Sequence, residues 1–365
     1  MTGSTSMQTP PQPSTSVGSP STPARPTLVW WKKLILLGFA AGISFLLSEV
    51  VIRVSGVVRN VGPSFTEFDA VYGKRVKPNY HCWRTSPDFE MEFTTNSLGH
   101  RGPEPAQPPR DAVVFIGDSF TMGYGVSDGD EFPQQVSAGL DAAGLRNANG
   151  ASIPVVNFGM GHNGNGRWIK YLESDVAEYA PRLVVFQVTG NDYGDNVDEG
   201  LYRLGTDGEL VEQPIAPPSG LRRLQSAIEA VPGLSYSHLV CFLKQVAVLG
   251  AGGGAAPISA KKSSEVEAPL EPAKPKELLT LALIERSFQL CAENGWPIEV
   301  LSVAVGDRML PRLRALCERY GATLFEVPRR ADRPDLYFET DGHWNAAGHQ
   351  FVSEHLVRAI RARFE

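Results

Sequence analysis

The segment "VVFIGDSFTMGYGV" (residues 113–126) joins a short apolar run to a glycine-rich turn that begins with Gly117, Asp118 and Ser119. A short, continuously apolar run is typical of a strand that is buried on both faces of a sheet. From residue 111 onward, runs of this kind alternate with longer helical stretches, which is the pattern of a parallel sheet covered by helices on both faces. We therefore predict a doubly wound α/β domain whose first strand ends just before Ser119.

The alternation predicts five strands and five helices. The strands are expected at residues 113–116, 154–158, 183–188, 298–304 and 323–327. The helices are expected at residues 131–143, 167–179, 276–294, 307–320 and 346–364. In a sheet of this kind, ligands bind beyond the carboxyl ends of the strands. Polar residues that directly follow a strand are therefore the first candidates for a functional site.

The N-terminal part has a different composition. Residues 1–33 are mostly Ser, Thr, Pro, Gly and Gln, which predicts a disordered tail. Residues 34–52 are apolar apart from small residues and Glu49, close to the ~20 residues that span a bilayer. Basic residues are more numerous before this segment than after it, which favours a cytoplasmic N-terminus. We expect an uncleaved, single-pass signal anchor, with a cleaved signal peptide and a buried core helix as alternatives.

Two parts of the chain do not follow the alternation. Residues 57–109 contain extended pieces joined by Pro and Gly turns, and we expect them to wrap around the core. An insertion at residues 193–275 separates the third and fourth strands. Within it, Asp207-Gly208 between two β-like runs predicts a hairpin, and residues 237–249 are helical in pattern. Residues 250–275 have the composition of a solvated linker.

The overall charge and the cysteines limit the possible partners. A net charge of -6 provides no basic field, so nucleic acid is not an expected partner. The four cysteines have no metal-ligand spacing, so no metal site is expected. Cys291 and Cys317 fall in predicted helices that flank one strand. They could form a disulfide in an oxidising compartment or be buried as small hydrophobic residues, and the sequence leaves both open.

Ser119 raises the question of nucleophilic catalysis, because a lone serine is a weak nucleophile that needs a base and an oxyanion site. The segment "ETDGHWN" near the C-terminus contains Asp341, His343 and Asn345. Histidine can transfer a proton near neutral pH, and Asp341 could orient its ring and stabilise its charged form. In the alternative interpretation, Asp341 or Asn345 caps the following helix and His343 is an ordinary loop residue.

The ends of the second and third strands could supply oxyanion donors. They carry the segments "NFGMGHNGNG" (157–166) and "VTGNDYGDN" (188–196). The side-chain amide of Asn191, the backbone N–H of Ser119 and a backbone N–H of the glycine-rich turn could stabilise a tetrahedral intermediate. An ordinary polar turn remains the alternative for each segment alone. Together with the Asp/His segment, however, they provide every component that acyl transfer requires.

These four segments resemble the blocks of the SGNH (GDSL-type) hydrolases. "GDSF" stands at 117–120, a glycine block follows the second strand, "GND" stands at 190–192, and an Asp/His block lies near the C-terminus. Their order and approximate spacing match the family over residues 111–365. The upstream "TNSLGHRGPE" is similar to the segment that precedes the domain in membrane-anchored bacterial members.

The resemblance implies a flavodoxin-like three-layer α/β/α sandwich with a parallel five-stranded sheet over residues 110–365. It implies Ser119 as nucleophile, His343 as general base, Asp341 as the orienting carboxylate and Asn191 as an oxyanion donor, with no metal or cofactor. This sequence differs from the usual pattern of the family in two places. Many members have the aspartate three residues before the histidine, not two. In the second block either Gly161 or His162 takes the position of the family's glycine, and we favour Gly161 as the donor.

We therefore expect a membrane-anchored serine esterase or acyl hydrolase, with its catalytic domain in the periplasm or at the cell surface. Its substrate would be a small-molecule, carbohydrate or lipid ester. The alternatives are an O-acyltransferase or deacetylase acting on an envelope polysaccharide, and a non-catalytic binding protein with the same fold. The other five histidines are expected to be structural: His81, His100, His238, His349 and His355.

Overall fold

The computed structural model describes residues 29–105, 109–147, 149–218, 220–231, 233–250 and 273–364. The chain divides into two compact units, Met1–Ser48 and Glu49–Glu365. Helix α1 (Trp30–Ser55) supplies the described part of the first unit and continues into the second. The predicted tail up to residue 28 lies outside the described residues. Trp30 to Lys33, predicted to end that tail, are helical instead, so the helix begins four residues before the predicted start at Leu34.

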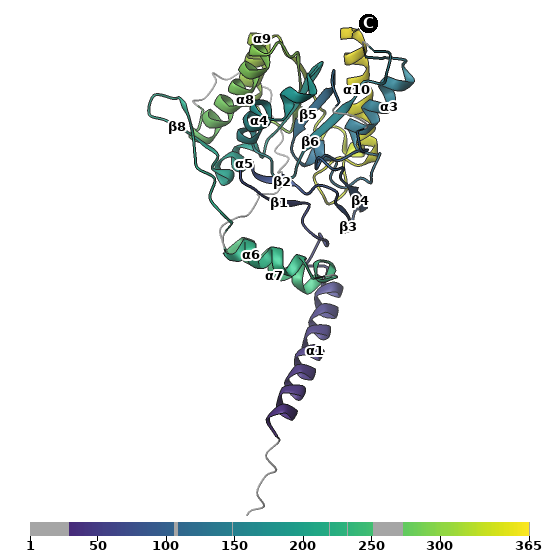
Figure 1. Ribbon diagram of the computed structural model, residues 1–365, viewed down its shortest axis with the longest axis vertical. Coiled ribbons are helices and arrows are strands. Elements are labelled where there is room, and N and C mark those ends of the chain that lie inside the picture. The colour runs from purple at the N-terminus through teal and green to yellow at the C-terminus, as the bar shows by residue number, and fades with distance from the viewer. Residues whose placement is uncertain are drawn as a thin grey trace, which may run out of the picture. The chain divides into compact units, whose positions relative to one another are not determined.

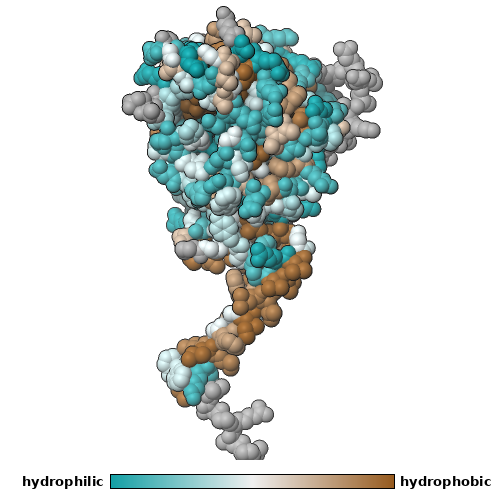
Figure 2. Space-filling view, turned by 90° about the vertical axis from the view of Figure 1, so that its right-hand side faces the viewer, coloured by the Kyte–Doolittle hydropathy of each residue, from teal (hydrophilic) through white to brown (hydrophobic). Residues whose placement is uncertain are grey.

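Helix α1 is long and apolar enough to cross a membrane. Its 26 residues correspond to about 39 Å at ~1.5 Å per residue, against a hydrocarbon core of about 30 Å. No residue of α1 is buried in the described part of the chain, and Figure 2 shows its hydrophobic surface in brown. A signal sequence of this length and composition would have the same properties.

The second unit is built on a five-stranded sheet in which every neighbouring pair is parallel. Its strands are β5 (Val113–Gly117), β6 (Val155–Gly159), β7 (Leu183–Thr189), β10 (Ile298–Val303) and β11 (Thr323–Glu326). Across the sheet they lie in the order β11-β10-β7-β5-β6. Counted along the chain this is the order 2-1-3-4-5 of flavodoxin-like folds, in which ligands bind where the winding direction reverses. The predicted parallel sheet is confirmed, and the reversal lies between β5 and β7.

Alternating side chains of β5 enter two hydrophobic layers, one on each side of the sheet. Val114 and Ile116 belong to the layer covered by α4, α8 and α9, whereas Val113 and Phe115 belong to the layer covered by α3 and α10. Figure 1 shows these two groups of helices on opposite sides of the sheet. The helices are α3 (Phe132–Ala142), α4 (Asn165–Glu173), α8 (Pro275–Glu293), α9 (Leu310–Tyr320) and α10 (Ala346–Phe364). The fold is a three-layer α/β/α sandwich.

The predicted helix at 167–179 is divided in the structure. Helix α4 ends at Glu173, and a separate 3-10 turn, η1, covers Val176–Tyr179. The hydroxyl of Ser174 donates a hydrogen bond to the carbonyl of Lys170, at 2.7 Å. Ser and Asp side chains compete with the helix for backbone groups, and here the Ser-Asp pair at 174–175 separates the two elements.

Residues before the sheet form two antiparallel hairpins, which we call the wrap. One pairs β1 (Thr66–Asp69) with β2 (Gly73–Val76), and the other pairs β3 (His81–Thr85) with β4 (Glu90–Thr94). In the insertion, β8 (Tyr202–Leu204) and β9 (Leu210–Glu212) form the predicted hairpin around Asp207 and Gly208.

The rest of the insertion is helical where it is described. Helix α5 (Asp192–Glu199) follows β7 directly. Helix α6 (Gly220–Glu229) was not predicted, whereas α7 (His238–Gly250) lies within one residue of the predicted 237–249. Most of the predicted linker lies outside the described residues, and α8 begins at Pro275. All four cysteines are buried free thiols. Cys291 and Cys317 therefore form no disulfide and are buried as small hydrophobic residues.

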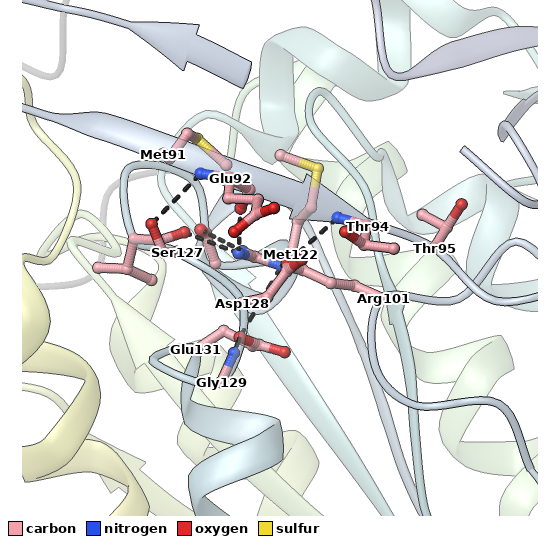
Figure 3. Close-up of polar contacts among 12 residues, drawn as sticks. Met91, Glu92, Thr94, Thr95, Arg101, Met122, Ser127, Asp128, Gly129 and Glu131 are labelled. Carbon is pink, nitrogen blue, oxygen red and sulfur yellow. Dashed lines mark hydrogen bonds and ion pairs between the residues drawn. The ribbon is translucent and has the colours of Figure 1, made fainter. Parts of the chain in front are cut away.

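Arg101 fastens the wrap to the loop that follows Ser119. Its guanidinium donates to the carbonyl oxygens of Met122 (3.0 Å), Gly123 (2.6 Å) and Val126 (2.7 Å). It also donates to the carbonyl of Glu92 on β4, at 3.1 Å, as Figure 3 shows. The side chain is almost fully buried, and two carboxylates balance its charge: Asp128 at 3.0 Å and Glu131 at 3.8 Å.

We expect Arg101→Ala to lower the free energy of unfolding by about 3–5 kcal/mol, because it leaves buried carbonyls and the Glu131 carboxylate without their cation. Urea denaturation followed by tryptophan fluorescence measures this loss. Arg75→Ala is the matched control, since that exposed arginine pairs with Glu67 on the surface and should cost no more than about 1 kcal/mol. Equal losses in the two variants would contradict the anchoring role of Arg101.

Candidate active site

Ser119 is the first residue of the short helix α2 (Ser119–Met122), which follows β5 after Asp118. The buried Asp118 caps this helix, because its Oδ1 accepts a hydrogen bond from the backbone N–H of Phe120 at 2.9 Å. Its Oδ2 accepts from the hydroxyl of Thr189 at the end of β7, at 2.8 Å. The turn is also too tight at Gly117 for a side chain, since a Cβ there would lie 2.2 Å from the hydroxyl of Thr121. These contacts fix Ser119 at the point where the sheet reverses its winding.

His343 lies against Ser119, although the two residues are 224 positions apart. The Oγ of Ser119 is 2.6 Å from the Nε2 of His343. On the other side of the ring, Nδ1 is hydrogen-bonded to the Oδ1 of Asp341. The rings of Phe120 and Tyr124 lie 4.8 and 5.0 Å from the imidazole, centre to centre, and limit its movement. A hydroxyl, an imidazole and a carboxylate thus form one hydrogen-bonded chain.

The electrostatic environment keeps Asp341 ionised. Partial burial by itself would raise the pKa of Asp341, but the hydrogen bonds and the charge of His343 outweigh it and hold this pKa below its ordinary value. An ionised carboxylate at Nδ1 favours the imidazole tautomer that leaves Nε2 free to accept a proton. The Nε2 of His343 is then in position to accept the proton of the Ser119 hydroxyl.

Asp88, in the turn between β3 and β4, lies behind Asp341. Its Oδ2 accepts hydrogen bonds from the backbone N–H of Asp341 at 2.6 Å, and from the N–H and hydroxyl of Thr340 at 2.9 and 2.6 Å. Burial would raise the pKa of Asp88, but these hydrogen bonds lower it. The wrap therefore positions the loop that carries Asp341. Sequence reasoning missed Asp88, because "SPDFE" has no pattern that distinguishes it from any other polar turn.

Gly161 and His162 lie on the turn that follows β6. This turn is bound to the carbonyl of Gly117, which accepts from the N–H of Met160 at 3.2 Å and from the side-chain amide of Asn163 at 2.8 Å. Lys74 on β2 holds the turn from the other side, donating to the carbonyls of Gly161 at 3.0 Å and His162 at 2.8 Å. The turn is thus fixed next to the end of β5, two residues before Ser119.

Of the two candidate positions in this turn, His162 adopts the left-handed backbone conformation, with a φ of 52°. That conformation favours glycine and costs free energy for a residue with a Cβ. At Gly161, in contrast, φ is ordinary and an added Cβ would meet nothing within 4 Å. The backbone strain in the second block therefore falls on the histidine, not on the glycine.

Asn191 lies beyond β7, at the start of α5. Its amide nitrogen donates to the Oδ2 of Asp195 at 2.8 Å, while the Oδ1 of Asp195 lies 3.4 Å from the Nδ1 of His162. A side-chain amide carries two hydrogens, so the second one remains for an oxyanion. The hydrogen bond with Asp195 raises the pKa of His162 above its ordinary value. Asp195 therefore links the second block to the third, a role that sequence reasoning missed.

Two of the other histidines, His100 and His349, are kept neutral by their surroundings. Burial lowers the pKa of His100 to about 4 and that of His349 to about 3, so both are neutral near pH 7. The Nδ1 of His349 accepts a hydrogen bond from the N–H of Phe132 at 3.2 Å. Among the described residues, no group of three or more His, Cys, Asp or Glu side chains is placed to hold a metal ion.

Residues 115–270 match the sequence model of the GDSL-like lipase/acylhydrolase family. The chain carries a GDSL-type hydrolase domain. The protein is therefore a hydrolase that acts on ester bonds. The GDSL-type match begins within β5 and includes Ser119, Gly161 and Asn191. It ends before Asp341 and His343, which the fold brings back to the same edge of the sheet.

Solved structures similar to this GDSL-type protein share little sequence with it. The psychrotrophic esterase EstA from Pseudoalteromonas sp. is 11% identical, with 69% of this chain and 97% of that chain covered and a TM-score of 0.40. A lipase/acylhydrolase from Enterococcus faecalis is 14% identical, with 70% of this chain and 97% of that chain covered and a TM-score of 0.37. A GDSL-like lipase from Bacteroides thetaiotaomicron is 13% identical, with 70% of this chain and 89% of that chain covered and a TM-score of 0.35. Among curated proteins, none matches the chain in sequence.

Proposed function

We propose that this protein is a membrane-anchored serine esterase that cleaves its substrate outside the cytoplasm through an acyl-serine intermediate. One observation carries the proposal. The Oγ of Ser119 lies 2.6 Å from the Nε2 of His343, whose Nδ1 is bonded to Asp341. A serine in hydrogen-bonding reach of a base that a carboxylate orients is the arrangement required for an activated nucleophile.

In the first half of the reaction, the Oγ of Ser119 attacks the carbonyl carbon of the ester, and its proton passes to the Nε2 of His343. The carbonyl becomes a tetrahedral oxyanion, for which we assign three donors: the backbone N–H groups of Ser119 and Gly161 and the amide of Asn191. When the intermediate collapses, the C–O bond to the alcohol breaks and His343 returns the proton to the departing alkoxide. The acyl group is then an ester of Ser119.

In the second half, water attacks the acyl-serine while His343 takes one of its protons. Collapse of the second intermediate breaks the bond to Ser119, which recovers the proton from His343, and the carboxylic acid leaves. A sugar hydroxyl in place of water would transfer the acyl group by the same steps. The ratio of hydrolysis to transfer therefore depends on which acceptor reaches the acyl-enzyme, and not on a different set of catalytic residues.

The proposed location rests on α1. Its length and apolar composition suit a bilayer, and Arg25, Lys32 and Lys33 precede its apolar segment, whereas Arg53 and Arg59 follow it. An excess of basic residues on one side favours the cytoplasm for that side. The catalytic unit follows α1 and would then lie on the outer side.

A fluorophosphonate probe tests whether Ser119 is activated, because the probe reacts with a serine whose proton a base can accept. We expect the purified full-length protein to be labelled on the peptide that contains Ser119, as located by mass spectrometry. Labelling should be lost in Ser119→Ala and strongly reduced in His343→Ala, with heat-denatured protein as the blank. An unlabelled native protein would favour a non-catalytic binding role, and unchanged labelling of His343→Ala would contradict the assigned base.

A further inference from the structure

Helices α6 and α7 leave a row of large apolar side chains exposed. On and just after α6, Leu224 is 57% exposed and Val231 is 48% exposed; on α7, Leu243 is 56% and Val246 is 48% exposed. Residues spaced by three, four or seven positions lie on one face of a helix. Each helix thus carries one apolar row, in which Ile228 and Leu239 are half-buried and the others exposed. We call the two rows together the interfacial face: Leu224, Ile228, Val231, Leu239, Leu243 and Val246.

The opposite side of α7 is already packed against the catalytic unit. Cys241 is buried in a small cluster with Val58 and Val61, at the start of the wrap. Cys241 and Leu243 differ by two positions, or about 200° around the helix, so they point to opposite sides. Helix α7 is therefore apolar on both sides; the side of Cys241 is buried, whereas Leu243 and Val246 on the other side are about half exposed. Exposed apolar side chains grouped on one face of a helix are typical of an interaction site.

The end of α1 holds the start of α7. The carboxylate of Glu49 accepts hydrogen bonds from the N–H of His238 and the N–H of Leu239, both at 2.9 Å, and from the hydroxyl of Ser237 at 2.7 Å. A negative charge at a helix N-terminus is favourable. Ile52 of α1 also packs against the cluster around Cys241. The first turn of α7 is thus fixed to the last two turns of α1.

The position of Glu49 along α1 indicates where the hydrocarbon would end. The segment from Trp30 to Ser48 is about 28 Å long at ~1.5 Å per residue, which is close to the ~30 Å thickness of a bilayer core. A carboxylate is costly inside that core, so Glu49 belongs at its boundary. A helix whose N-terminus is bound to Glu49 must then begin at the same boundary.

Further contacts join α6 and α7 to the wrap. Lys244 on α7 pairs with Glu229 on α6 at 2.7 Å, and Lys77, just after β2, lies 3.6 Å from the same carboxylate. The N–H of Trp83 on β3 lies 3.4 Å from the hydroxyl of Tyr236, and both aromatic side chains are exposed. Trp and Tyr are the residues most enriched where a membrane meets water.

We propose that the interfacial face lies in the headgroup and acyl-chain boundary of the phospholipid bilayer that holds α1. Leu224, Leu243 and Val246 would enter the acyl chains, with Trp83 and Tyr236 at the level of the headgroups. This inference rests on the proposed anchoring by α1. It adds a second membrane contact, one that fixes the orientation of the catalytic unit, because the ion pair of Lys77 with Glu229 and the buried cluster around Cys241 join these helices to the wrap.

The orientation matters for the catalytic edge of the sheet. Helix α10 begins three residues after His343 and ends at the C-terminus, which Figure 1 marks at the end of the catalytic unit far from α6 and α7. The start of α10 therefore lies nearer to α6 and α7 than the C-terminal end of this helix does. With the interfacial face on the bilayer, His343, three residues before α10, and the Ser119 bonded to it would lie nearer to the membrane than the C-terminal end of α10.

A fluorophore that reports polarity tests the contact in the full-length protein reconstituted into phosphatidylethanolamine and phosphatidylglycerol nanodiscs. Leu243→Cys is labelled with nitrobenzoxadiazole, since the four native cysteines are buried. Leu36→Cys on α1 reports the anchor, and Val197→Cys, exposed on α5, is the matched control. We expect blue-shifted emission at positions 36 and 243, quenched by doxyl-labelled phospholipid, and unshifted, unquenched emission at position 197.

The outcomes separate this inference from the proposed anchoring. Quenching at 36 but not at 243 would overturn the interfacial face and leave the anchor intact. No quenching at either position would show that α1 is not inserted. Blue-shifted emission at 243 without doxyl quenching would mean that protein, such as a second copy of this chain, covers the face, and would also overturn the inference. Fluorophosphonate labelling of Ser119 in each labelled variant verifies that the catalytic unit is folded.

Discussion

Replacement of Ser119 by alanine is expected to reduce kcat/KM for p-nitrophenyl butyrate by about 10⁴- to 10⁶-fold, the range found when the nucleophile of a serine triad is removed. The reason is that His343 then has no hydroxyl to deprotonate, and no acyl-enzyme can form. The measurement is the release of p-nitrophenol by the full-length protein in detergent, after subtraction of the uncatalysed rate. Removing one hydroxyl from a half-buried position should leave the melting temperature close to that of the wild type.

Ser127→Ala is the matched control for this loss. Ser127 lies on the same loop, eight residues further on, and its hydroxyl accepts a hydrogen bond from the N–H of Glu92 at 3.2 Å. We expect that variant to retain the wild-type rate within a small factor. Equal rates for Ser119→Ala and the wild type would rule out the acyl-serine mechanism altogether.

Asp341→Asn is expected to lower kcat by about 10⁴-fold near neutral pH, as the equivalent change does in a serine triad. An asparagine amide at this position would donate to the Nδ1 of His343 and so select the tautomer whose Nε2 already carries a hydrogen. That ring cannot accept the proton of Ser119. The same assay with saturating ester measures the effect, and KM should change little because Asp341 is not in contact with the substrate in the proposed mechanism.

Asp335→Asn serves as the control, since this carboxylate pairs with Arg333 at the surface at 2.7 Å, six positions before Asp341. Its activity should match that of the wild type. The kcat of Asp88→Asn should lie between those of Asp341→Asn and Asp335→Asn, because Asp88 orients the loop that carries Asp341 and does not touch the imidazole of His343. A wild-type rate for Asp341→Asn would assign the orientation of His343 to some other group.

The sheet could be predicted from the sequence because its strands are buried on both faces. All residues of β5, β7 and β10 are buried, so their sequences are mostly apolar, interrupted only at Gln187 in β7 and at Glu299 and Ser302 in β10 before the polar residues that follow each strand. The order of these runs, together with the rules for parallel connections, leaves few topologies. Ser119 and Asn191 could be predicted for the same reason, since each follows such a run directly.

The supporting residues of the site could not be found in this way. Asp88, Lys74 and Asp195 act through backbone groups or through another side chain, so their identity is not tied to any periodic pattern. Two of them belong to the wrap, whose strands have only four or five residues each and are joined by Pro and Gly turns, so that they resemble loops in sequence. Their importance depends on contacts across long stretches of chain, which a single sequence does not reveal.

The contacts of the wrap have a practical consequence for anyone who shortens this chain. A fragment that begins at residue 110, where the alternation of strands and helices starts, would still contain Ser119, Asn191, Asp341 and His343. It would lack the guanidinium of Arg101, which binds the loop after Ser119, the ammonium of Lys74, which holds the turn beyond β6, and the carboxylate of Asp88, which binds the loop of Asp341. We therefore expect the smallest active fragment to begin upstream of β1, and the segment that is recognisable from its sequence blocks to be inactive by itself.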